Sequence, residues 1–285
     1  MAKIKRRKPN RSIEGDICNI IILIIFGAFM VLPLVYAVSN AFKPMDELFI
    51  FPPRFFVRNP TLKNFKDLFV LMSQSWVPFS RYIFNTVFIT VVGTVGHVLI
   101  ASLAAFALAK HRFPGQRIFF KMVVLSLMFS GHVTAIPNYL TMSKLGWIDT
   151  YWSIIIPAFA SSLGLFLMKQ FMEQIPNSIL ESARIDGASE FRIFWNIVMP
   201  AVKPAWLTLV ILSVQSLWNT QGGNFIYSEE LKTLPYALQQ ILAAGIARAG
   251  VGAAVGVIMM IVPITTFIIT QSNVIETMTT SGIKE

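Results

Sequence analysis

Several segments of this chain are long, apolar and free of charge, and they constrain its fold more than any other feature. Segment 17–38 holds 22 residues without Lys, Arg, Asp or Glu, and segment 83–109 is equally uncharged. At a rise of about 1.5 Å per residue, a helix of this length crosses a hydrocarbon core of about 30 Å. In lipid, a chain satisfies its backbone hydrogen bonds only as helices or closed barrels. We therefore expect a helical membrane protein.

The composition agrees with this class. Only 13% of the 285 residues are charged, whereas soluble domains carry about 25%. A net charge of +10 would favour nucleic-acid binding in a soluble protein, but six Lys and Arg residues crowd the first eleven positions, directly before an apolar segment. Such clusters mark the cytoplasmic side of a bilayer. We expect a lipid bilayer, and no nucleic acid, as a partner. Segment 17–38 exceeds the signal-peptide core of about 7–15 residues, which favours a retained helix.

The apolar pattern predicts an all-α polytopic protein with six transmembrane helices. Six spans place both termini on one side, and the segments on that side hold 15 of the 24 Lys and Arg residues, which makes it cytoplasmic. The expected spans are 17–38, 83–109, 120–141, 150–169, 204–222 and 250–272. The expected division is a basic cytoplasmic tail 1–16, a first transmembrane helix 17–38, an extracytoplasmic loop 39–80, a main transmembrane domain 81–272 and a cytoplasmic tail 273–285.

A polar loop, residues 176–200, lies between the fourth and fifth spans on the predicted cytoplasmic side. Ser178 and Glu181 fit the Ser-x-x-Glu capping box, which predicts that a helix starts there. Gly187 is expected to end this helix, because Gly readily adopts the left-handed conformation at a helix C-terminus. A second helix is expected over 189–197. Its apolar surface is expected to comprise Phe191, Phe194, Trp195 and Val198.

The residues alone leave two interpretations of this loop open. In one, Glu181 caps a helix, Gly187 turns the chain and the loop rests on the lipid surface. In the other, the helix–turn–helix projects and binds a partner protein, because Ala183 and Gly187 form a small-residue face that allows close approach. Helix capping explains Glu181 but not the spacing of the whole loop.

The same loop resembles a family motif. Glu181-Ser182-Ala183, three residues, Gly187, nine residues and the run Ile197–Pro200 are similar to the EAA motif of the membrane subunits of ATP-binding-cassette (ABC) importers. Ser182 and Met199 depart from the motif but keep its size classes. The resemblance covers nearly the whole chain from about residue 17, and it is closest to the six-span permease of maltose-type carbohydrate systems. Further similar stretches are 85–86, 104–115, 136–140 and 145–150.

The resemblance implies the type I ABC importer permease fold, with a cytoplasmic coupling helix in loop 176–200. It implies four kinds of partner in a bacterial cytoplasmic membrane: a second homologous permease, two ABC ATPase subunits, an extracytoplasmic solute-binding protein and a carbohydrate. The loop after the fifth span would meet the binding protein, with Gly222, Gly223 and Asn224 as candidate contacts. The residues implicated in ATPase coupling are Glu181, Ser182, Ala183, Asp186, Gly187, Ile197 and Pro200.

The sequence lacks the patterns of an ATP-hydrolysing or metal-binding chain. No Gly-x-x-x-x-Gly-Lys-Ser/Thr run is present, so we expect no catalytic residue, metal or cofactor here, and ATP with Mg on the partner ATPase. His111 is expected to stay solvated in a basic loop. His97 and His132 lie within spans, where a polar side chain forms a structural hydrogen bond or lines a pathway. No Asp or Glu falls inside a predicted span, which argues against an ion-driven carrier.

Neutral polar side chains do occur inside the spans. A sugar needs hydrogen-bond partners and an aromatic platform but no charge, so such residues are candidates for a carbohydrate pathway. Polar residues also join transmembrane helices to one another, and both roles stay open. The candidates are Ser130, His132, Asn138, Gln215, Trp218 and Asn219.

The sequence therefore favours a non-catalytic permease subunit of an ATP-driven importer of carbohydrate, with oligosaccharide as the expected substrate. The alternatives are an ATP-independent channel or carrier for a small polar solute, and a membrane scaffold without transport.

Overall fold

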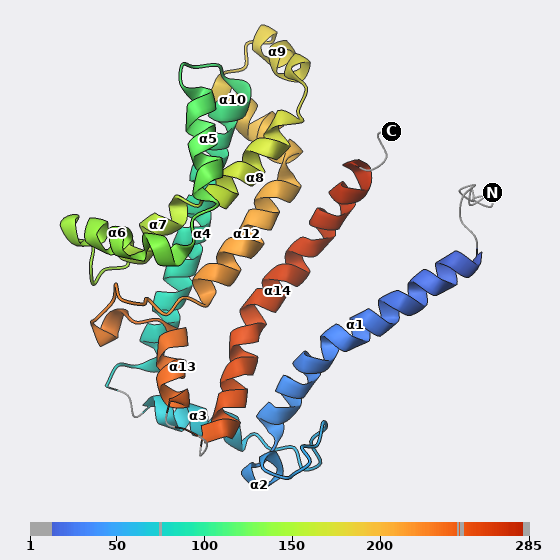
Figure 1. Ribbon diagram of the computed structural model, residues 1–285, viewed down its shortest axis with the longest axis vertical. Coiled ribbons are helices and arrows are strands. Elements are labelled where there is room, and N and C mark those ends of the chain that lie inside the picture. The colour runs from blue at the N-terminus through green and yellow to red at the C-terminus, as the bar shows by residue number, and fades with distance from the viewer. Residues whose placement is uncertain (1–12, 74–75, 244, 246–247, 282–285) are drawn as a thin grey trace. The chain divides into compact units, whose positions relative to one another are not determined.

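The computed structural model describes residues 13–73, 76–243, 245 and 248–281, and those residues are helical or irregular, without a strand. The predicted all-α class is confirmed. The helices are α1 Ile13–Phe42, α2 Met45–Leu48, α3 Lys63–Ser73, α4 Phe79–Lys110, α5 Gln116–Ser126, α6 Gly131–Lys144, α7 Trp152–Phe159, α8 Ser162–Glu173, α9 Asn177–Ile185, α10 Glu190–Ile193, a π-helical turn Phe194–Val198, α11 Met199–Ala201, α12 Lys203–Trp218, a 3₁₀ turn Glu229–Leu231, α13 Leu234–Leu242 and α14 Ala249–Ser281 (Figure 1).

Four of the six predicted spans match a single long helix, whereas the third and the fifth fall within bent pairs of helices. Four helices in the described part of the chain are long and apolar enough to cross a membrane, and the number rises to six only if each of two bent pairs counts as one span. The last helix also continues to Ser281, through most of the segment expected to be a tail. Residues 1–12 of the expected basic tail lie outside the described residues. The four long spans are Gly15–Phe42, Phe79–Lys110, Trp152–Glu173 and Ala249–Gln271.

The third predicted span, 120–141, is wrong as a single helix. Helices α5 and α6 replace it, and their axes differ by 113°. The cause is local: Ser130 has an extended backbone and its hydroxyl accepts a hydrogen bond from the backbone N–H of His132 at 3.4 Å. A Ser N-cap satisfies a donor at a new helix start. Ser130, a pathway candidate, therefore acts as a cap, and His132 beside it is exposed.

The chain divides into two parts, Met1–Val70 with Ala244–Val257 and Leu71–Ala243 with Ile258–Glu285. In the first part, two buried charged residues organise the loop that follows α1. The Lys43 ammonium donates to the Arg54 carbonyl at 2.5 Å, and the Glu47 carboxylate accepts from the backbone N–H of Arg58 at 2.7 Å. A buried charge is tolerated when hydrogen bonds replace its hydration, so both residues fix the course of this loop.

The second part is built around α4, which packs against α7, α8 and α12. One apolar cluster joins α4 to the segments that follow α8. Phe106 of α4, Met172 of α8 and Leu209 of α12 are all buried in it. Because this cluster includes residues of α9, α10 and the π-helical turn, the polar loop 176–200 is anchored to the helix bundle. Figure 1 shows α9 and α10 together at one end of this part.

Asn85 joins the other end of α4 to the segment before α13. Its amide donates to the backbone carbonyls of Glu230 and Lys232, each at 2.8 Å. Its side-chain oxygen accepts from the Tyr151 hydroxyl at 2.7 Å. This fully buried amide therefore uses both donor hydrogens and its acceptor, and it binds two segments that are far apart in sequence to α4.

Asp149 forms a second link between distant segments, in a loop outside the helices. Its carboxylate accepts from the backbone N–H groups of Tyr227 and Ser228, at 2.9 and 2.8 Å, and from the Ser228 hydroxyl. Burial raises the pKa of Asp149, but these hydrogen bonds and the nearby Lys232 ammonium outweigh it and hold the pKa below the ordinary value of 3.8. The charged carboxylate is therefore the form that holds the two loops together.

Candidate functional site: the polar knob and an intramembrane cavity

We call residues 176–200 the knob. Its first helix, α9, ends in the turn that the sequence predicts. Gly187 has a φ of +82°, its N–H donates to the Arg184 carbonyl at 3.0 Å, and the N–H of Ala188 donates to the Ala183 carbonyl at 2.9 Å. This pair of bonds is the Schellman arrangement, which needs a left-handed residue at the turn. The role of Gly187 as a helix terminator is confirmed.

The predicted capping box is wrong. Helix α9 begins at Asn177, with Pro176 as its N-cap and no side-chain cap hydrogen bond. Proline has no N–H, so Glu181 has no N-cap donor to reach back to. Ser178 lies inside the first turn, where its carbonyl accepts from the Ser182 hydroxyl at 2.9 Å. The second helix does start as expected, because the Ser189 hydroxyl accepts from the N–H of Arg192 at 3.3 Å.

The expected apolar surface of the second helix is split between two faces. Phe194 and Val198 are buried in the cluster shared with α4, α8 and α12, whereas Phe191 is 70% exposed. The π-helical turn over 194–198 places more residues in one turn than an α-helix does, so side chains expected on one face diverge. The knob is therefore anchored by one row of apolar residues and presents another.

The presented row is apolar in a polar surrounding. Ile185 is 86% exposed and Ile179 is 48% exposed. Two of the coupling candidates, Ala183 and Ile197, pack against the buried cluster. The other five are exposed: Glu181, Ser182, Asp186, Gly187 and Pro200. Exposed large apolar side chains on a fixed scaffold are typical of a surface that binds another protein or a membrane.

An ion pair closes the knob. Arg184 donates to both carboxylate oxygens of Glu190, at 2.7 and 3.3 Å. The hydrogen bond from Arg184 holds the pKa of Glu190 below its ordinary value, and the same bond raises the pKa of Arg184. His111 adds to this pair, with its Nε2 atom 3.6 Å from the Glu190 carboxylate. The expectation that His111 stays solvated holds in part, because 39% of its side chain is exposed while its ring packs edge-on against Phe106.

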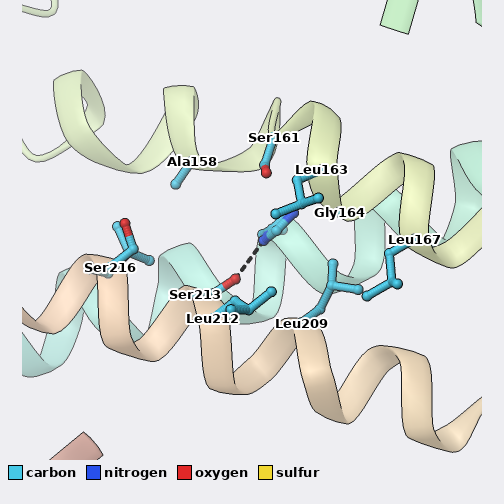
Figure 2. A pocket seen from close by; sticks show the side chains of 11 residues that line it. Ala158, Ser161, Leu163, Gly164, Leu167, Leu209, Leu212, Ser213 and Ser216 are labelled. Atoms are coloured by element: carbon cyan, nitrogen blue, oxygen red, sulfur yellow. Dashed lines mark hydrogen bonds between the residues drawn. The ribbon is translucent and has the colours of Figure 1, made fainter. Parts of the chain in front are cut away.

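A cavity of about 320 Å³ lies between α4, α8 and α12 (Figure 2). Its polar lining comes from His97, Ser161, Ser213 and Ser216. The Nδ1 atom of His97 is hydrogen-bonded to the Ser213 hydroxyl at 2.6 Å. Its Nε2 atom is buried and has no hydrogen-bond partner among the described residues. The dashed line in Figure 2 marks this hydrogen bond of Ser213, and Ser161 lies at the start of the opposite helix.

Gly164 makes room for the His97 ring. A Cβ atom at this position would lie 2.1 Å from His97 Nε2, which is far inside van der Waals contact. The close approach of α8 to α4 therefore depends on the absence of a side chain at Gly164. Both roles considered for His97 are compatible with its position, since it forms a structural hydrogen bond and also lines a cavity.

A second cavity, of about 340 Å³, brings some of the predicted residues together. Asn138 of α6 lines it together with Gly222 and Gly223, and Ser216 lines both cavities. Trp218 lies elsewhere, because it is buried and its indole N–H donates to the Met259 carbonyl at 3.1 Å.

The remaining candidates line neither cavity. Gln215, Asn219 and Asn224 are exposed, and the Asn219 amide donates to the Gln215 carbonyl at 2.7 Å. Sequence reasoning assigned no pathway role to Ser213 or Gly164. Ser213 does carry a signal, because its three-residue spacing from Ser216 puts both hydroxyls on one face of a helix.

Comparisons with known proteins agree on one class. Residues 97–278 match the family described as binding-protein-dependent transport system inner membrane component. Protein LplC of Bacillus subtilis is 35% identical over 232 residues, covering 80% of this chain and 74% of LplC. The arabinooligosaccharides transport system permease protein AraQ of Halalkalibacterium halodurans is 32% identical over 273 residues, covering 91% of this chain and 93% of AraQ.

Two solved structures share the fold. One is a bacterial ABC transporter involved in the import of the acidic polysaccharide alginate, with a TM-score of 0.76 at 24% identity, covering 93% of this chain and 99% of the other. The second is a bacterial alginate ABC transporter in complex with an alginate pentasaccharide-bound periplasmic protein, with a TM-score of 0.59 at 16% identity, covering 90% and 93%.

Proposed function

The chain belongs to the family of binding-protein-dependent transport system inner membrane components, and we propose that it is the permease subunit of an ATP-driven carbohydrate importer. Family membership makes it a membrane-embedded transport protein. The carbohydrate assignment is supported by the relative named for arabinooligosaccharides, which aligns over nearly its whole length. Oligosaccharides are the substrate class that we propose.

The exposed apolar row of the knob carries this proposal. Ile185 and Phe191 are 86% and 70% exposed on a short helical hairpin whose other face is fixed in the bundle. A partner that covers these side chains would bury apolar area without reordering the hairpin, which lowers the entropic cost of binding. We propose that this partner is a separate ATPase, because the chain has no phosphate-binding loop of its own.

The rest of the assembly follows from this role. A second homologous permease would complete the pathway, two ATPase subunits would bind ATP and Mg, and a solute-binding protein would deliver the sugar outside. The solute-binding protein is supported by the family description, which states that transport depends on a binding protein. Both termini and the knob would face the cytoplasm, with Gly222, Gly223 and Asn224 on the outer side near the binding protein.

We propose the two cavities as the part of the sugar pathway that this chain lines. Hydroxyl and amide groups bind sugar hydroxyls without a net charge, and the cavity walls carry Ser216, Asn138 and His97. Ser216 contributes to both cavities, which supports a continuous route. Ser130 and Trp218 would support the pathway indirectly, Ser130 through a helix cap and Trp218 through its hydrogen bond to the Met259 carbonyl.

The test replaces Ile185 by Glu in the chain co-expressed with its permease, ATPase and binding-protein partners. Co-purification of the ATPase and uptake of an arabinooligosaccharide into proteoliposomes are expected to fall by about tenfold or more, as when an interface anchor is lost. Leu145→Glu is the matched control, because Leu145 is 51% exposed in a loop outside the knob. Unchanged co-purification and uptake would refute docking at this site.

The same vesicles separate the competing functions. Uptake that persists without any ATPase would identify an ATP-independent carrier. Vesicles that hold every partner and ATP but take up no solute would indicate a scaffold.

A further inference from the structure

The last residue of α4 contacts the chain that leads into the knob. Lys110 Nζ donates to the Ile175 carbonyl at 2.6 Å and to the Asn177 side-chain oxygen at 3.3 Å. Ile175 lies between the end of α8 and the start of α9, where helix-terminal carbonyls lack helical partners. An ammonium at such a helix C-terminus also interacts favourably with the helix dipole. Lys110 therefore ties α4 to the first turn of the knob.

The next residue contacts the far side of the knob. The His111 ring packs against Phe106 with centroids 5.2 Å apart, and Phe106 packs against Phe194 at 5.5 Å. His111 Nε2 also lies 3.6 Å from the Glu190 carboxylate. Two adjacent residues at the C-terminal end of α4 thus contact both helices of the knob. Lys110 contacts the start of α9, and His111 contacts α10.

This arrangement matters because of the chain connectivity. The knob is covalently continuous with α8 on one side and with α12 on the other, whereas α4 precedes it by more than sixty residues. A pull on the knob reaches α8 and α12 through the backbone. It reaches α4 through side-chain contacts, and α4 is the helix against which α7, α8 and α12 all pack.

We propose that Lys110 and His111 transmit movement of the knob to α4, so that α4 moves with α8 and α12 when the ATPase changes state. This inference rests on the proposed function, because it presupposes an ATPase on the knob. Lys110 and His111 act as positioning residues, since they act through their contacts with the knob. Loss of the contact would uncouple hydrolysis from transport without releasing the ATPase.

Lys110→Met tests the inference, because it removes the ammonium and keeps most of the apolar stem. ATP hydrolysis by the reconstituted complex is expected to stay within about twofold, while sugar uptake per ATP falls about tenfold, within the usual range of a coupling between sites. Lys110→Arg keeps a charged donor at this position. Its uptake per ATP is expected to reach at least about half of the value for the unmodified complex. Lys144→Met is the matched control, because Lys144 is an exposed lysine in the last turn of α6.

The inference would be overturned if the ratio of uptake to hydrolysis were the same in three complexes: Lys110→Met, Lys144→Met and the unmodified one. If Lys110→Met does not accumulate in the membrane, His111→Ala is measured in its place, with the same expected fall in the ratio and the same overturning result. Failure of the unmodified chain to bind an ATPase would instead refute the proposed function, and co-purification registers that outcome separately.

Discussion

At the scale of single residues, Gly164 shows how a missing side chain positions a polar one. The His97 ring occupies the space that a Cβ at Gly164 would fill, and its other nitrogen is hydrogen-bonded to Ser213. One residue of α8 thereby determines whether α4 and α12 remain connected by that hydrogen bond. Gly187 has a different role, since a Cβ at this position would meet nothing within 4 Å and only the φ of +82° requires glycine.

Gly164→Ala is expected to displace the His97 ring and to lower the free energy of unfolding by about 1–3 kcal/mol, the usual cost of overpacking. Thermal unfolding of the purified chain in detergent measures the effect. Gly256→Ala is the control, because a Cβ at Gly256 meets nothing within 4 Å. The double variant Gly164→Ala/His97→Ala should recover part of the loss, and equal melting temperatures for both Gly→Ala variants would contradict the steric argument.

At the scale of the elements, the knob combines a turn that the sequence predicts with a helix start that it does not. The Schellman turn follows from one glycine, whose conformational preference is local. The capping box failed because Pro176, two residues before Ser178, provides the N-cap and has no N–H. The bend between α5 and α6 was missed because apolar periodicity continues across it, while the Ser130 cap is a signal of one residue.

The Arg184–Glu190 pair makes the knob sensitive to acid. The folded-state pKa of Glu190 is lowered, so its contribution is present above the unfolded value of about 4.5 and is lost as the pH falls through the folded pKa. The expected loss is below about 1 kcal/mol, because both side chains are exposed. Amide hydrogen exchange of Arg192 and Ile193 between pH 6 and pH 3, corrected for intrinsic rates, should show weaker protection at low pH.

Glu190→Gln is the matched variant for this measurement. In this variant, the amides of Arg192 and Ile193 should exchange at the same corrected rate from pH 6 to pH 3. An equal pH dependence in the variant would assign the effect to another group.

At the scale of the whole molecule, the helical class could be predicted and the long-range contacts could not. Hydropathy identifies helices because lipid enforces them. The contacts of Lys110, Asn85 and Asp149 join segments that are separated by tens of residues, and a single sequence contains no signal for such pairs. The exposed apolar faces of α5 and α6 also depend on what surrounds the subunit, since α5 buries no residue within this chain.

Asp149 offers a test of those long-range contacts. Asp149→Ala removes three hydrogen bonds to Tyr227 and Ser228 and places Ala at a φ of +59°. We expect a loss of about 1–2 kcal/mol in the free energy of unfolding, together with faster proteolytic cleavage within residues 223–228. Asp149→Asn tolerates the left-handed backbone and keeps one acceptor oxygen, so its loss should be smaller. Unchanged stability and unchanged proteolysis in Asp149→Ala would show that the carboxylate bonds contribute nothing.

The Asn85 contact has a further consequence for how such a protein changes over generations. Asn85 donates to the backbone carbonyls of Glu230 and Lys232, not to their side chains. Every amino acid supplies that carbonyl, so the hydrogen bonds place no demand on which residues stand at positions 230 and 232. These bonds therefore leave descendants of this gene free to alter the chemistry displayed at position 230, whereas the Lys232 ammonium also pairs with the Glu229 carboxylate at 2.9 Å. Asn85 itself has no such freedom, because the contact uses its side-chain amide.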